Sequence, residues 1–83
     1  MEVKLSTTDF DFFTENFTCA IDSIQDVNRN DSTVSFAIKN SDLIAFEVDM
    51  DSDIIHNGMD KQNTVNETGK RMYKIRDTII DQL

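Results

Sequence analysis

Apolar and polar residues alternate most regularly in the middle of the chain, over residues 43–53. The apolar positions of this run are Ile44, Phe46, Val48 and Met50. The acidic positions are Glu47, Asp49, Asp51 and Asp53. A period of two residues is typical of a β-strand with one buried face, because successive side chains of a strand point to opposite sides. Residues 43–50 are therefore predicted as the strongest strand, with a row of carboxylates on the solvent side at a spacing of about 6.7 Å.

Shorter patterns predict the elements around this strand. Residues 2–5 alternate as an edge strand, and residues 33–38 alternate as a strand that pairs with 43–50 in an antiparallel hairpin. Ser6 is expected to cap a short helix over about residues 7–15, with Asp9 three positions later. Residues 65–82 have the spacing of an amphipathic helix that begins near Gly69, and residues 51–64 between these elements are mostly polar.

Residues 17–27 fit two interpretations. Phe17, Cys19 and Ile21 alternate like a strand, whereas a stripe of apolar residues from Phe10 to Ile24 also fits one long helix. Thr, Phe and Ile are poor helix formers, which favours the strand. The choice decides whether the neighbouring carboxylates of Asp22 and Asp26 join the acidic face.

The predicted order of elements is β, α, β, β, β, α. This order indicates an α+β fold: an antiparallel β-meander of about three to four strands, packed by a C-terminal amphipathic helix and a short N-terminal helix. The chain has 83 residues, of which 39% are hydrophobic. We therefore expect residues 1–83 to form a single small acidic domain.

The net charge of −8 excludes several classes of partner. Residues 1–60 carry 13 acidic and three basic side chains, whereas residues 61–83 carry three acidic and five basic ones. A field of this sign repels nucleic acids and anionic membranes and attracts basic protein surfaces. We expect no direct contact with nucleic acid, and no apolar run is long enough to span a membrane.

No residue pattern indicates catalysis, a metal or a cofactor, so we expect a protein that is not an enzyme. His56 is the only histidine and has no cysteine nearby, so it cannot form a zinc site. Cys19 is the only cysteine, which excludes an intrachain disulfide and favours the reducing cytoplasm, and its apolar setting favours a buried thiol. Asp49, Asp51, Asp53 and Asp60 occupy positions one, three, five and twelve of a calcium loop. However, Ile54 stands where such a loop requires glycine.

The acidic side chains have two interpretations. They give solubility, or they form an electronegative face that binds a basic protein groove. Duplex DNA carries one charge per roughly 1.7 Å of axis, and closely spaced carboxylates approach that density. Under the second interpretation, Phe12 is expected as an exposed aromatic contact. The other partner-binding candidates are Asp22, Asp26, Asp31, Asp42, Glu47, Asp49, Asp51 and Asp53.

On the run Glu47-Val48-Asp49-Met50-Asp51-Ser52-Asp53, its small size and its lack of catalytic motifs, the chain resembles small acidic inhibitors encoded by phages and mobile elements. These include type II anti-CRISPR proteins that act as DNA mimics. The resemblance implies a stoichiometric inhibitor in the host cytoplasm, bound to the nucleic-acid-binding channel of a CRISPR effector nuclease or another nucleic-acid-binding protein. The alternative is a small homodimeric structural or assembly protein of a phage or operon, in which the acids only give solubility.

Overall fold

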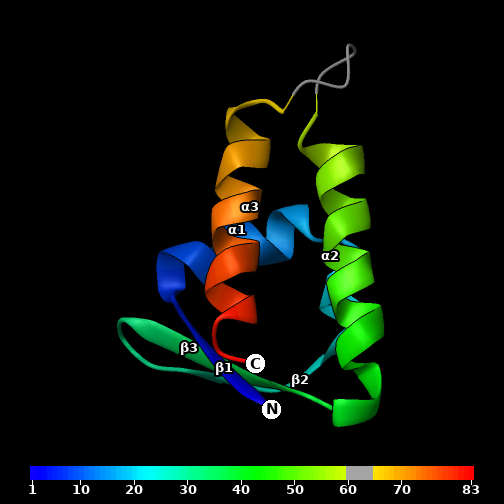
Figure 1. The fold of residues 1–83 in the computed structure, drawn as a ribbon. Helices are drawn as coiled ribbons and strands as arrows, with labels where there is room; N and C mark the ends of the chain where they lie inside the picture. The colour runs from blue at the N-terminus through cyan, green and yellow to red at the C-terminus, as the bar shows by residue number, and fades with distance from the viewer. Residues whose placement is uncertain (60–64) are drawn as a thin grey trace.

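Three strands form one antiparallel sheet in the computed structural model, which describes residues 1–59 and 65–83 (Figure 1). The strands are β1 (Glu2–Ser6), β2 (Ile24–Arg29) and β3 (Thr33–Ile38), in the spatial order β1-β3-β2. The last strand of the chain thus lies in the middle, between two partners. The fold is α+β, as the sequence predicts, but the sheet is not a meander of consecutive strands.

Three α-helices lie over one face of this sheet: α1 (Thr7–Asn16), α2 (Leu43–Asn57) and α3 (Glu67–Ile80). Two 3-10 helices, η1 (Ala20–Ser23) and η2 (Asn40–Asp42), lead into β2 and α2. Figure 1 shows α2 and α3 standing side by side and antiparallel, with α1 crossing beside them. No helix in the described part of the chain is long and apolar enough to cross a membrane.

The alternating patterns predicted for β1 and β3 are confirmed. Val3 and Leu5 of β1 lie opposite Phe36 and Val34 of β3, and all four side chains are buried on the helical side of the sheet. β2 pairs with the other edge of β3, and its register shifts between Gln25 and Asn28. The sheet therefore presents one apolar face to the helices.

Phenylalanine rings fill the space between the sheet and the helices. The Phe13 ring of α1 stacks on Phe17 at a centroid distance of 5.0 Å and on Phe36 of β3 at 5.8 Å. It also contacts Phe46 of α2 at 6.3 Å. Aromatic rings bury large areas and pack best in such offset or tilted pairs. One ring thus joins α1, β3 and α2 into a single core.

Polar side chains fix the starts of α1 and α3. The Ser6 hydroxyl accepts a hydrogen bond from the Asp9 N–H at 3.1 Å, so the predicted cap of α1 is confirmed. The Asn66 side chain accepts from the Gly69 N–H at 2.8 Å, and α3 begins at Glu67. Each cap satisfies an N–H that has no partner inside the helix.

The prediction of a strand over residues 43–50 is wrong, because these residues belong to α2. The hairpin with β3 is consequently absent. The run contains a second pattern: Leu43, Phe46, Met50 and Ile54 recur at helical spacing. The last three are fully buried, whereas Ile44 is 80% exposed, so the helical period defines the buried face.

The prediction for residues 17–27 is correct only in its second half. α1 ends at Asn16, which excludes the single long helix. Residues 20–23 form η1, and strand pairing begins at Ile24. Phe17 and Ala20 are buried and Ile21 packs against the core from this irregular connection, whereas Cys19 is exposed, so the apparent alternation came from a turn and a 3-10 helix.

Two glycines let the end of α2 approach the start of α3. A Cβ atom on Gly58 would lie 2.6 Å from the Gly69 Cα, and one on Gly69 would overlap the Gly58 carbonyl group. The Gly58 carbonyl accepts a hydrogen bond from the Asn66 N–H at 3.0 Å. Only residues without a side chain permit this contact, which sets how closely α2 and α3 meet.

Candidate interaction surface

The acidic run of residues 47–53 lies on α2 and does not form one row. Alternate residues of an α-helix are about 200° apart, whereas residues four apart share a side. Glu47 and Asp51 therefore project from one side of α2, and Asp49 and Asp53 from another. The predicted line of four carboxylates on one strand face is wrong.

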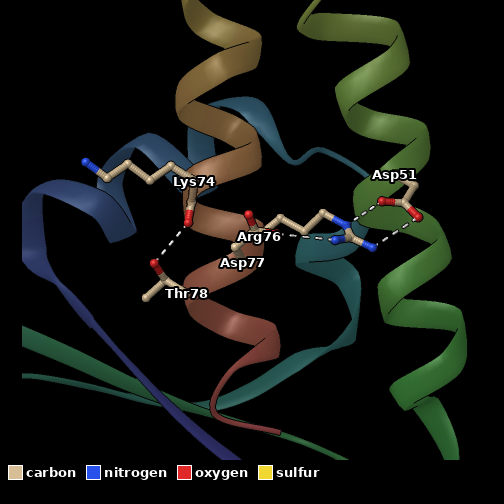
Figure 2. A network of polar contacts seen from close by, with 5 residues as sticks. All are labelled: Asp51, Lys74, Arg76, Asp77 and Thr78. Atoms are coloured by element: carbon tan, nitrogen blue, oxygen red, sulfur yellow. Dashed lines mark hydrogen bonds and ion pairs between the residues drawn. The ribbon is translucent and has the colours of Figure 1, made fainter.

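Asp51 faces the basic helix α3 and is engaged there. Its carboxylate contacts the Arg76 guanidinium through the Nε atom at 2.5 Å, and Arg76 also lies 3.5 Å from Asp77 (Figure 2). Figure 2 shows the Arg76 side chain reaching across from α3 to α2. One cation thus serves two carboxylates, and Asp51 ties the two helices together instead of standing free in solvent.

Asp53 is buried, with 1% of its surface exposed. Its two oxygens accept hydrogen bonds from the Ala20 N–H at 2.9 Å and from the Cys19 N–H at 3.0 and 3.1 Å. These N–H groups lie at the start of η1, where a helix leaves donors unsatisfied and favours an anion. The side chain therefore holds η1 against α2, and the prediction that Asp53 is displayed to a partner is corrected.

Asp22 and Asp49 carry their charges near the thiol of Cys19. The pKa of Cys19 is raised above its ordinary value of 9.0, mainly by its hydrogen bond and charge interaction with Asp53, then by desolvation and by the charges of Asp49 and Asp22. Cys19 is exposed, which corrects the expectation of a buried thiol. Because the thiolate is the reactive form, this environment suppresses nucleophilic chemistry at the thiol.

The remaining candidate carboxylates lie apart from one another. Asp42 is half-buried at the start of α2, where its side chain caps no backbone N–H. Asp31 is exposed before β3 and Asp42 follows it, so the six-residue strand separates them by roughly 20 Å. Asp26 is exposed in the irregular part of β2, with a left-handed φ of 55°. The predicted set is thus divided among α2, η1 and the β2–β3 hairpin.

Phe12 is not an exposed aromatic contact. The ring is half-buried against the core, and the Arg71 guanidinium of α3 lies over it, 4.3 Å from its centroid. Arg71 also approaches Asp9 at 3.7 Å. A cation over an aromatic face is attracted by the ring electrons, so Phe12 and Asp9 hold α3 on α1.

No arrangement of side chains in residues 1–59 and 65–83 would hold a metal ion. His56 is exposed on α2, where its Nδ1 lies 2.8 Å from the Ser52 carbonyl oxygen. Asp51 projects from a different side of α2 than Asp49 and Asp53, and a helix cannot wrap an ion as a loop does. Asp60, the twelfth position of the calcium-loop comparison, lies outside the described residues.

Three exposed aliphatic residues of α2 form the feature that sequence reasoning missed. Ile44 is 80% exposed, and Val48 and Ile55 are each 57% exposed. The sequence pattern placed Ile44 and Val48 in the core with the predicted strand. The separation of the three residues by four and seven positions is a helical spacing, and this signal could have found them.

Neither the family models, the curated proteins nor the solved structures gave a match to this chain. The function is therefore inferred from the geometry and charge of the chain itself.

Proposed function

We propose that the protein is a non-enzymatic acidic protein that binds a basic surface of another protein. The proposed target class is a nucleic-acid-binding surface, such as that of a host nuclease, which keeps the inhibitor role suggested by the resemblance to small phage proteins. Binding would depend on the net negative field of the protein and not on a regular spacing of charges, because the carboxylates do not lie along a strand.

The observation that carries this proposal is the imbalance of ion pairs. Arg29, Lys70, Arg71 and Arg76 are engaged with carboxylates of the same chain, whereas Lys4, Lys39 and Lys74 pair with no carboxylate among the described residues. Nine carboxylates, by contrast, have no cationic partner among the described residues and no backbone contact like that of Asp53. They are Glu2, Glu15, Asp22, Asp26, Asp31, Asp42, Glu47, Asp49 and Asp81.

Internal pairing therefore leaves a field that is strongly negative toward solvent. Such a field speeds association with cationic surfaces and disfavours anionic partners. The contribution of this field to association falls with ionic strength, since the Debye length shrinks from about 10 Å at 0.1 M salt to about 3 Å at 1 M. Salt dependence is therefore the property that distinguishes this function from a role in assembly through apolar contacts.

The test is capture of partners by the immobilised protein from a bacterial lysate at roughly 50 and 500 mM salt. The proposal predicts enrichment of basic nucleic-acid-binding proteins at low salt only. A variant with Asp42→Asn, Glu47→Gln and Asp49→Asn, which spares the engaged Asp51 and Asp53, should capture less basic protein at low salt. Recovery of no basic protein at low salt, or equal recovery by this variant, would contradict the proposal.

The inhibitor role has its own assay. DNA cleavage by a purified type II CRISPR effector nuclease should fall as the protein approaches an equimolar amount, and excess competitor DNA should restore it. Unchanged cleavage at high molar excess would remove this nuclease class from the proposal without affecting the lysate result.

A further inference from the structure

We infer that the solvent-facing side of α2 is the contact surface for this partner, and that it receives an amphipathic segment with apolar residues flanked by Lys or Arg. The surface is defined by Ile44, Val48 and Ile55, called here the α2 stripe. The inference rests on the proposed function and specifies which side of the molecule performs it.

The α2 stripe follows one side of the helix, with Asp51 and Ser52 in the turn between Val48 and Ile55. At about 100° and 1.5 Å per residue, Val48 lies about 40° and Ile55 about 20° around the axis from Ile44, over a length of roughly 16 Å. The buried residues Phe46, Met50 and Ile54 project about 100–180° away from its centre line. The stripe is therefore a second apolar face of α2, separate from the one that packs on the core.

Tyr73 of α3 is an exposed aromatic residue near the same end of the helix pair as Ile55. The Asp51–Arg76 pair marks where the two helices meet (Figure 2). Ile55 lies one turn beyond Asp51, and Tyr73 lies one turn before Arg76. Because α2 and α3 are antiparallel (Figure 1), Ile55 and Tyr73 lie toward the same end of the helix pair, measured from the Asp51–Arg76 contact. Tyr73 is 39% exposed, and tyrosine is a residue type that often anchors protein interfaces.

The charges around the α2 stripe select the occupant. Glu47 flanks it toward α3, Asp51 on the same side is already paired with Arg76, and α2 contains no Lys or Arg. A second copy of the chain would bring two such helices together, each on a protein of charge −8. Like charges in an interface disfavour that pairing, whereas cations beside an apolar ridge complement it. The occupant is accordingly a cationic amphipathic segment of a different protein.

Two synthetic peptides of about four helical turns serve as probes. One carries leucine on one face and lysine on the other, and the second replaces every leucine with serine at the same charge. Titration into the ¹⁵N-labelled protein should shift amide resonances along α2 with the first peptide. Its affinity should exceed that of the serine peptide by at least tenfold.

A variant with Ile44→Ser, Val48→Ser and Ile55→Ser should bind the leucine peptide no better than the serine peptide. A variant with leucine at the same three positions should bind like the natural protein, and Val27→Ser, at an exposed residue of β2, should leave affinity unchanged. Retained affinity in the serine variant, or shifts confined to other elements, would overturn the inference.

Failure of the inference and failure of the proposed function have different signatures. Equal, salt-sensitive binding of both peptides would overturn the assignment of the α2 stripe as the contact surface while leaving the acidic binding function in place. Binding of neither peptide at low salt would contradict both. Sedimentation could show that the natural protein is a dimer and that the serine variant is a monomer. That result would identify a second copy of the chain as the occupant and overturn the inference.

Discussion

The carboxylate of Asp53 accepts a hydrogen bond from the backbone N–H of Ala20, 33 positions earlier in the chain. This contact joins α2 to η1 in the buried interior. It also fixes the rotation of α2 about its own axis. With Asp53 turned inward, Ile44, Val48 and Ile55 are turned toward solvent.

Removing this carboxylate should destabilise the protein. Asp53→Ala leaves the N–H groups of Cys19 and Ala20 without their acceptor, and hydrogen bonds to a charged group contribute about 1.5–3 kcal/mol each. We expect the free energy of unfolding in urea to fall by about 2–4 kcal/mol. Asp22→Ala, at an exposed carboxylate on η1, is the control and should change it by less than about 0.5 kcal/mol. Equal effects of the two substitutions would refute the role of Asp53.

The thiol of Cys19 reports the charge of its neighbours. The raised pKa means that less thiolate is present at pH 8 than for an ordinary cysteine, so alkylation by iodoacetamide should be slow. The rate should rise with pH through an inflection above 9.0. Asp49→Asn removes one of the charges that disfavour the thiolate, so it should lower the pKa and speed alkylation at pH 8. Asp31→Asn changes the net charge equally at a distance from the thiol and should leave the rate unchanged.

The contact between Gly58 and Gly69 should tolerate no side chain. Alanine normally stabilises a helix by about 1 kcal/mol relative to glycine. In Gly69→Ala, however, the new methyl group would meet the Gly58 carbonyl, and such overpacking costs about 1–3 kcal/mol. We therefore expect a lower melting temperature for Gly69→Ala and little change for Lys70→Ala, at the exposed next position of α3. A melting temperature raised by Gly69→Ala would show that the helices do not meet there.

Asp51 and Arg76 should be energetically coupled. A double-mutant cycle with Asp51→Asn and Arg76→Gln isolates their interaction from other effects. Half-exposed pairs of this kind contribute up to about 1 kcal/mol, so we expect a coupling of roughly 0.5–1 kcal/mol that shrinks at high salt. Additive effects of the two substitutions on unfolding would mean that the pair does not tie α2 to α3.

Much of the fold could be predicted from local patterns, because those patterns were unambiguous. Val3 and Leu5 alternate only as a strand, Ser6 and Asp9 form a recognisable cap, and the apolar residues of α3 fit only a helix. Residues 43–50 satisfied the strand and helix periods together. The deciding contacts, above all that between Asp53 and η1, come from distant parts of the chain.

The candidate surface was less predictable for the same reason. The sign of the field follows from composition, but the fate of each carboxylate depends on tertiary contacts. Asp51 meets Arg76 25 positions later, and Asp53 meets η1 more than 30 positions earlier. The exposure of Ile44, Val48 and Ile55 follows from the helical period of α2 and not from the two-residue period of the predicted strand.

Residues 43–57 form a helix with Asp53 turned inward and the α2 stripe turned outward, and the proposed contact surface depends on this orientation. Methyl NMR with a soluble paramagnetic agent tests this directly. We expect strong broadening of the Ile44, Val48 and Ile55 methyl signals and protection of the buried Ile54. Protection of both Ile44 and Val48, with strand-like backbone chemical shifts over residues 43–50, would contradict it.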